Sequence, residues 1–168
     1  MRDSVHFWTQ VYSKYSTNQG IIHDSSYLNV IYEIVDLSGI DNSKKLAHIQ
    51  KIKDKWRKVL LKVEQKKNLP LKMTKEELRV FKLFKNVNDP NKFMDASIGK
   101  RIRFQKGQKD QFYKALERST LFISKIENIL TTHGVPKELA RLPLVESSFN
   151  VFAYSKAGAK GVWQIMPQ

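Results

Sequence analysis

The 168-residue sequence contains no cysteine. This absence excludes disulfides, thiolate zinc sites and thiol catalysis, and it leaves the redox compartment undecided. The four histidines, His6, His23, His48 and His133, lack the paired spacing of zinc ligands, so we expect no metal site. Long apolar stretches are also missing, since no window approaches the roughly 18 consecutive apolar residues that a transmembrane helix needs.

The two ends of the chain lack further expected features. A secretory signal needs an unbroken apolar run after a basic start, and Asp3, His6 and Gln10 interrupt any such run. At the other end, Met166-Pro167 indicates a turn or the start of another element, because proline disfavours helix in the residue before it. We therefore expect a C-terminally truncated chain that ends inside a domain. Truncation would then also explain the missing signal without implying a cytoplasmic address.

Positive charge is abundant. Lys and Arg total 30 against 16 Asp and Glu, a net charge of +14, while 41% of the residues are hydrophobic, which is enough for a buried core. Such a surface favours anionic partners: nucleic acid, anionic lipid or an acidic polymer such as cell-wall glycan. Residues 41–72 hold eleven Lys or Arg against three acidic residues. This run is either a binding surface for a polyanion or a solvated helix face.

Apolar spacing predicts a mainly α fold. We expect helices over residues 4–15 and 42–66, the second with an apolar stripe from Leu46 to Val63. Thr74 and Glu77 form a capping-box pattern that should start a third helix, and residues 86–91 should form a loop. Residues 27–37 are rich in β-branched and aromatic side chains, and their spacing does not decide between a strand and a buried helix.

The second half of the chain should continue in helices. We expect Asp95 to cap a short helix towards Ile102, and one long helix from about residue 109 to 133. Gly134 stands where a glycine would end that helix, and Pro136 stands where the next would begin. The predicted organisation is a basic helical N-terminal region, residues 1–105, followed by a different domain over residues 106–168.

Glu146 is the candidate catalytic group. It lies on a predicted helix among apolar residues, between Val145 and Phe149, and no Asp or Glu follows it. Burial disfavours the charged form of a carboxyl and raises its pKa, which is what a general acid needs near neutral pH. A lone glutamate at a helix end is more often an ordinary surface carboxylate, so the neighbouring pattern decides its meaning.

That pattern is a stretch of small residues from Ser155 to Gly161, followed by Trp163, Gln164 and Met166. Small residues let the backbone approach a ligand closely. Flat apolar groups beside an amide suit a carbohydrate. Phosphate-binding glycine motifs are absent, which argues against a nucleotide.

The segment ARLPLVESSFNVFAYSKAGAKGVWQIMP resembles the soluble-lytic-transglycosylase domain of bacterial cell-wall lytic enzymes. The matching motifs are Glu146-Ser147 and Gly161-Val162-Trp163-Gln164, joined by Ser155-x-Ala-Gly-Ala. The resemblance covers residues 98–168 and is weaker for the opening of the chain. It implies that residues 106–168 are the first part of a lysozyme-like domain.

The resemblance also implies roles for individual residues. Glu146 matches the family's catalytic acid/base, Ser147 its motif partner and Ser155 a serine that faces the reacting sugar, while Gln164 and Met166 match glycan-contacting positions. The implied reaction cleaves the β-1,4 bond between N-acetylmuramic acid and N-acetylglucosamine and forms 1,6-anhydro-muramic acid, with no metal or cofactor. The implied partner is the glycan strand of peptidoglycan, with no nucleic acid, in the periplasm or cell envelope. Membrane association of the full-length protein and its oligomeric state stay open.

Two further motifs of that family, an Ala-Tyr-Asn segment and a cleft tyrosine, have no counterpart in the 168 residues. We therefore expect Glu146 to be more exposed in this chain than a general acid requires, and we expect little activity. Two alternatives remain: a helical module that binds peptidoglycan without cutting it, and a basic nucleic-acid binder. The second leaves the Glu146–Gln164 pattern unexplained.

Overall fold

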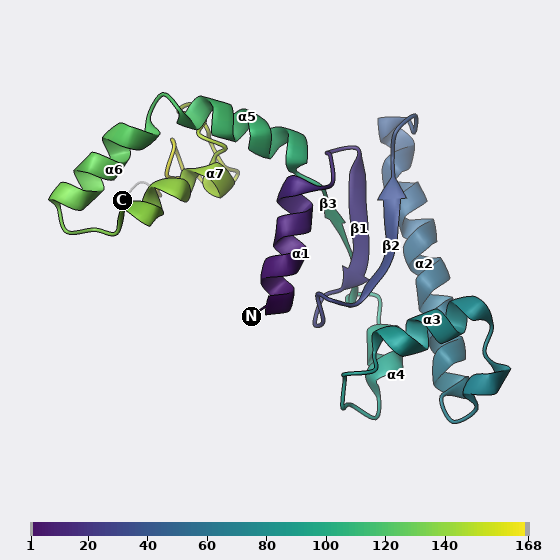
Figure 1. Ribbon diagram of the computed structural model, residues 1–168. Coiled ribbons are helices and arrows are strands. Elements are labelled where there is room, and N and C mark those ends of the chain that lie inside the picture. Colours follow the sequence, from purple (N-terminus) through teal and green to yellow (C-terminus); the bar gives the residue numbers. More distant parts are fainter. Residues whose placement is uncertain (1, 167–168) are drawn as a thin grey trace. The chain divides into compact units, whose positions relative to one another are not determined.

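The computed structural model describes residues 2–166, and the chain divides into two compact units, Met1–Gly107 and Gln108–Gln168 (Figure 1). The described residues form seven α-helices, two short 3-10 helices and one three-stranded sheet. This mainly α composition confirms the expected fold class. Among these residues, no helix has both the length and the apolar character that a membrane span requires.

The first unit holds the sheet and the longest helix, α2 (Asn42–Lys66). Its elements in chain order are α1 (Arg2–Ser13), β1 (Gln19–Asp24), β2 (Ile31–Asp36), α2 (Asn42–Lys66), a 3-10 turn (Pro70–Lys72), α3 (Lys75–Leu83), α4 (Lys92–Ala96) and β3 (Ile102–Lys106).

The sheet has the order β2-β1-β3, and β1 pairs antiparallel with both neighbours. The 27–37 segment, left open by the sequence, contains strand β2. The expectation that Asp95 caps a short helix towards Ile102 is wrong. Asn91 is the N-cap of α4, Asp95 lies inside that helix, which ends at Ala96, and Ile102 begins β3. Gly20 is required where β1 meets β3, since a Cβ there would collide with the ring of Phe104.

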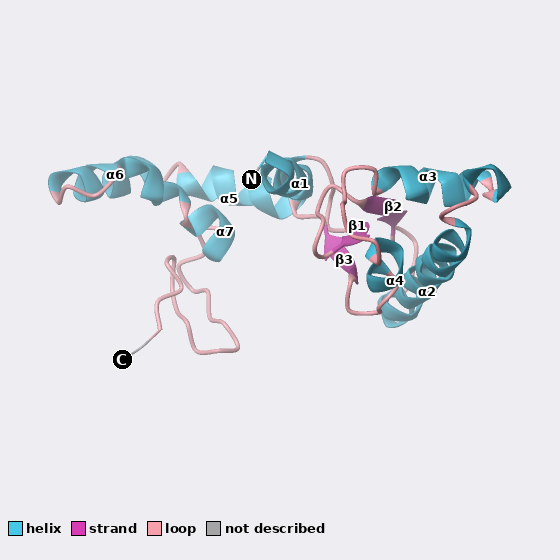
Figure 2. Cartoon of the chain, turned by 90° about the horizontal axis from the view of Figure 1, so that it is seen from below, coloured by secondary structure: helices cyan, strands magenta, loops and turns pink. Residues whose placement is uncertain are grey.

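Helices cover both faces of this sheet (Figures 1 and 2). Successive side chains of a strand point to opposite faces. Ile21 accordingly packs with Phe7 and Val11 of α1, while Ile22 belongs to the larger core shared with α2, α3 and α4. The core sits on the α2 side, where Trp56 and Tyr32 stack at 5.9 Å between ring centroids.

Helix α2 has the bounds that the sequence predicts, residues 42–66. Its fully buried side chains begin at Trp56, and Ile49 and Ile52 pack against the core as partly buried residues, so the expected apolar stripe is wrong at Leu46, which is 81% exposed. The capping box of α3 is confirmed. The hydroxyl of Thr74 accepts from the Glu77 amide at 3.3 Å, and the Glu77 carboxylate accepts from the Thr74 amide at 2.9 Å.

The second unit contains α5 (Lys109–Ser119), α6 (Ile123–Thr132), a 3-10 helix (Lys137–Arg141) and α7 (Pro143–Glu146). The single helix expected over residues 109–133 is therefore wrong: it is interrupted after Ser119. At the interruption, the hydroxyls of Ser119 and Thr120 donate to carbonyls three residues earlier, at 2.6 and 2.8 Å, which competes with continuation of the helix.

The end of α6 agrees with the sequence. Gly134 has φ +70°, and the amide of Val135 reaches back to the Leu130 carbonyl at 2.9 Å, which is the closure that a C-terminal glycine permits. Pro136 precedes the next helix as its N-cap and is not its first residue. This turn directs the chain towards α7 and the candidate site.

Candidate functional site

Glu146 is the last residue of α7, a single turn that opens with Pro143. Directly after it the chain reverses through Ser148 and Phe149, at φ +54° and +55°. The amides of Ser147 and Phe149 both donate to the Pro143 carbonyl, at 3.3 and 3.0 Å. Phe149 is 1% exposed, so burial of its ring holds a backbone conformation that side chains other than glycine rarely adopt. The turn therefore fixes the backbone that carries Glu146.

Ser147 connects this turn to the second motif. Its hydroxyl donates to the carbonyl of Val162 at 2.7 Å, across 15 residues of chain. The structure thus brings the Glu146-Ser147 motif and the Gly161–Gln164 motif together through one side chain.

Ser155 lies at a tight turn. Its backbone amide donates to the Ala159 carbonyl at 2.8 Å, and its side-chain oxygen accepts from the Ala159 amide at 2.9 Å. Gly158, inside the turn, has φ +95°, a conformation that favours glycine. Accepting from Ala159 leaves the hydroxyl proton of the half-buried Ser155 able to donate to another group.

Gln164 and Met166 follow on the same segment. Gln164 has φ +49°, and its side-chain amide nitrogen donates to the carbonyls of Gly161 at 2.9 Å and Ala153 at 3.4 Å. The donor side of this amide therefore organises the loop, and its oxygen is the group left to accept. Met166 is 55% exposed, and its terminal methyl lies 3.9 Å from the place of a Cβ on Gly158, so it lies beside the Ser155 turn.

The surroundings of Glu146 differ from the expectation. Its carboxyl is exposed, and neighbouring Leu142 and Val145 are 44% and 51% exposed. The prediction that apolar side chains enclose the Glu146 carboxyl is therefore wrong within the described residues 2–166. The expectation that Glu146 is exposed in this chain agrees with the structure. Of the other carboxylates in this unit, Glu127 is paired with Arg141 at 2.6 Å. No cluster of three or more His, Asp or Glu side chains within residues 2–166 could hold a metal ion.

Arg118 is a supporting residue that the sequence did not reveal. From the last turn of α5, its Nε donates to the carbonyl of Ser148 at 2.8 Å. This bond buttresses the reversal after Glu146 from a helix 30 residues earlier. No local pattern predicts the contact, because it depends on how α5 and α7 pack.

Comparison with known proteins bears on this geometry. Residues 125–168 match the model of the Transglycosylase SLT domain, and this range includes every candidate residue named above. This part of the chain is similar to a transglycosylase SLT domain. The resemblance recognised in the sequence is thereby confirmed.

Two kinds of curated relatives are similar to part of the chain. Membrane-bound lytic murein transglycosylase D of Escherichia coli K12 is 37% identical over 71 residues, which is 40% of this chain and 16% of that protein, and the protein of strain O6:H1 gives the same figures. An Alteromonas sp. (strain M-1) protein named for tributyltin chloride resistance is 40% identical over 50 residues, 30% of this chain and 24% of that protein. The alignments thus span at most about a quarter of these relatives. No solved structure gives a significant match.

Proposed function

We propose that the protein is a peptidoglycan lytic transglycosylase in which Glu146 is the general acid and base. The observation that supports this proposal best is the Ser147–Val162 hydrogen bond, because it joins the two SLT motifs beside an exposed carboxyl. Similarity to the SLT domain and to murein transglycosylase D points to the same substrate class. By the same similarity, we propose a periplasmic or cell-envelope location.

A reaction with one carboxylate suits the residues present. Most glycosidases place two carboxylates around the scissile bond. Glu146 stands in the SLT-like motif, whereas Glu127, another carboxylate of the same unit, is already paired with Arg141. We therefore assign both proton transfers to Glu146.

In the first step, the protonated Glu146 donates its proton to the glycosidic oxygen between N-acetylmuramic acid and N-acetylglucosamine, and the bond from this oxygen to C1 breaks. The resulting carboxylate then accepts the proton of the muramic C6 hydroxyl while O6 bonds to C1. The product is a 1,6-anhydro ring, and no water is consumed. The nucleophile belongs to the sugar itself, so binding supplies its position.

The other candidate residues would hold the glycan. We propose that Ser147 fixes the loop, that Ser155 presents its hydroxyl to the reacting sugar, and that Gln164 and Met166 contact neighbouring sugars. The Ser147 hydroxyl is bonded to Val162, whereas Ser155 has a hydroxyl proton free to donate. Gln164 offers an acceptor oxygen, and Met166 offers an exposed apolar side chain. None of them calls for a metal or cofactor.

A second function is favoured by a specific observation. The exposure of Glu146 and Val145 suits a module that binds peptidoglycan without cutting it, because catalysis in a closed site would exclude water from around the carboxyl. For the 168-residue chain alone we expect binding with little or no product.

The decisive experiment is mass spectrometry of the muropeptides released from peptidoglycan by the product of the complete reading frame that contains this sequence. Chains ending in anhydro-muramic acid, one water lighter than hydrolytic products, are expected. Mainly reducing muramic ends would overturn the transglycosylase assignment. Binding without any product would favour the non-catalytic module.

A further inference from the structure

Most of the positive charge lies outside the SLT-like segment. Residues 1–107 carry 22 Lys or Arg and 11 Asp or Glu, a net +11, whereas residues 108–168 carry 8 and 5, a net +3. The catalytic proposal uses none of the cations in the first unit.

Four lysines form a row on the exposed side of α2: Lys51, Lys55, Lys58 and Lys62, spaced by four, three and four residues. Together with Asp54 and Glu76 they line a shallow hollow of about 550 Å³. At 1.5 Å per residue the row spans about 16 Å. The row is therefore long enough to contact several anionic groups of one polymer.

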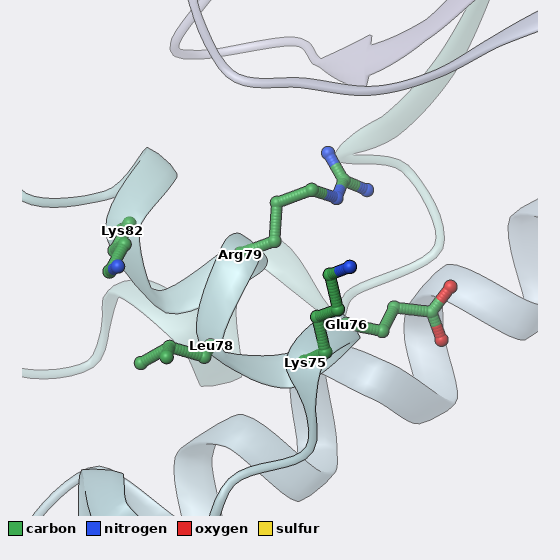
Figure 3. A pocket seen from close by; sticks show the side chains of 5 residues that line it. All are labelled: Lys75, Glu76, Leu78, Arg79 and Lys82. Carbon is green, nitrogen blue, oxygen red and sulfur yellow. The ribbon is translucent and has the colours of Figure 1, made fainter.

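A second hollow lies on α3 and measures about 580 Å³. Lys75, Arg79 and Lys82 line it with Leu78 and Glu76, and Figure 3 shows these five side chains extending from the helix. Helical spacing puts positions i, i+3, i+4 and i+7 on one side of α3. The hollow therefore combines three cations with one apolar contact.

Glu76 lines both hollows, so they adjoin. It pairs with Lys55 at 3.0 Å, and the Lys55 ammonium lies 4.4 Å from the centroid of the Trp56 ring. Arg79 is anchored as well, by a 2.7 Å hydrogen bond to the Tyr32 carbonyl. Two cations are thus held by the core of the unit.

The remaining cations are available for a partner. Within residues 2–166 they form no salt bridge, and they are Lys51, Lys58, Lys62, Lys75 and Lys82. Together with Lys55 and Arg79 they make up what we call the α2–α3 basic surface.

We propose that the α2–α3 basic surface binds the acidic peptide stems of peptidoglycan. This proposal rests on the proposed function for its polymer, and it assigns a second contact outside the catalytic segment. Peptide stems carry separate carboxylates along the glycan strand, and exposed ammonium groups attract them without needing a fixed geometry.

Two observations favour peptide stems over nucleic acid. Single-stranded nucleic acids need aromatic platforms for base stacking, and the aromatic ring beneath this surface, Trp56, is only 2% exposed. Moreover, Asp54 and Glu76 stand among the cations and would repel a continuous phosphate backbone. A peptide stem with spaced carboxylates and a free amine tolerates such acidic groups.

The test is co-sedimentation of the 168-residue chain with insoluble peptidoglycan, either intact or stripped of its stems by an amidase. We expect strong retention on the intact polymer, severalfold less on stripped glycan, and a decrease as salt rises from low to physiological. The triple variant Lys51→Glu/Lys58→Glu/Lys75→Glu should bind the intact polymer about tenfold more weakly.

The matched control is Lys14→Glu/Lys85→Glu/Lys100→Glu, which changes the net charge equally at exposed positions outside both hollows. Circular dichroism checks that both variants fold. Equal weakening by both sets, or equal retention on stripped glycan, would overturn the proposal. The proposal would also fail if the chain bound a single-stranded DNA oligonucleotide more tightly than peptidoglycan and only the Lys51→Glu/Lys58→Glu/Lys75→Glu variant lost that binding. Such a result would identify a nucleic acid as the partner.

The result is separable from the catalytic assignment. If the product of the complete reading frame releases anhydro-muramic products but binds intact and stripped peptidoglycan equally, the stem-binding inference fails and the proposed reaction stands. Stem-dependent retention without anhydro products would refute the proposed reaction alone.

Discussion

The hydroxyl of Ser147 donates a 2.7 Å hydrogen bond to the carbonyl oxygen of Val162. Ser147 follows Glu146 directly, and Val162 precedes Trp163 and Gln164, so this bond links the candidate acid to the candidate glycan-binding segment. Other bonds stabilise the segment itself: the Gly161 amide donates to Ala153 at 2.8 Å, Lys160 and Ile165 pair with each other, and the Gln164 side-chain amide donates to Gly161 at 2.9 Å. The Ser147 hydroxyl ties this segment to the turn after Glu146, so the loop should respond to its loss.

Ser147→Ala should loosen residues 160–165, with a local cost of about 1 kcal/mol for the lost hydrogen bond. We expect faster amide hydrogen exchange in peptides that cover Lys160–Ile165, and little change in α6. The control is Thr132→Ala, which removes a hydroxyl bonded to the Asn128 carbonyl within α6. Unchanged exchange at 160–165 in Ser147→Ala would show that the loop is held by its own backbone bonds.

Glu146→Gln should abolish cleavage of peptidoglycan by the product of the complete reading frame while leaving the fold and binding nearly intact. Glutamine keeps the shape of the side chain and cannot deliver or accept the proton, and a positioned acid/base contributes about 10²–10⁴-fold to the rate. Turnover is measured from released muropeptides. Glu138→Gln, an exposed glutamate two turns earlier, is the matched control and should retain activity. Substantial turnover by Glu146→Gln would remove Glu146 from the mechanism.

Local patterns predicted the elements that local interactions determine. The 25-residue helix α2, the Thr74–Glu77 capping box and the Gly134 helix end all follow from spacing and cap chemistry within a few residues. Strands β1 and β3 were not anticipated. Strand β3 pairs with β1 across more than 70 residues of chain, as in Lys106 with Gly20, and β1 lies between β3 and the nearby β2 in the sheet. Tertiary context decides there, and single-sequence patterns do not report it.

The candidate site shows the same division. Its residue types were evident from the sequence, since both motifs lie within 19 residues of chain. The exposure of Glu146, the Arg118–Ser148 bond and the Ser147–Val162 bond were not, because each depends on how α5, α7 and the following loop pack. Their contribution to function stays a prediction.

Arg101→Met should destabilise the first unit strongly. Asp24 is fully buried, and its carboxylate accepts from Arg101 Nε and Nη2 at 2.9–3.2 Å and from the Ser26 and Tyr27 amides at 2.8 and 3.0 Å. Removing the guanidinium leaves a buried charge without its partner, at a cost of about 3–5 kcal/mol. Urea denaturation followed by the fluorescence of buried Trp56, in a background with Trp8→Phe and Trp163→Phe, measures the loss.

Two variants control this measurement. Arg103→Met removes an exposed guanidinium that donates to the Lys100 carbonyl, and it should cost less than about 0.5 kcal/mol. Asp24→Asn combined with Arg101→Met should recover part of the loss, because an amide oxygen still accepts from the two backbone amides and no charge stays buried. If the double variant is no more stable than Arg101→Met, the buried charge is not the cause.

The contribution of Glu77 to stability should depend on pH. Its carboxyl is 3% exposed, and hydrogen bonds from the Lys66 ammonium at 2.8 Å and the Thr74 amide at 2.9 Å hold its pKa below the usual value of 4.5. A lowered pKa in the folded state means that the ionised form stabilises the fold above the unfolded pKa. This stabilisation is lost as pH falls through the folded pKa.

Glu77→Gln should therefore lower the free energy of unfolding by about 1–2 kcal/mol near neutral pH, because it weakens the capping box and removes the partner of Lys66. As the pH falls below the unfolded pKa and through the lower folded pKa, the wild-type chain loses the same interaction, so the two stabilities should converge. The measurement is urea denaturation through Trp56 at a series of pH values. Glu117→Gln, which removes an exposed carboxylate from α5, serves as the control. It should change the free energy of unfolding neither at neutral nor at acidic pH. A gap between wild type and Glu77→Gln that stays constant down to strongly acidic pH would mean that side-chain packing, and not ionisation, accounts for the effect of Glu77.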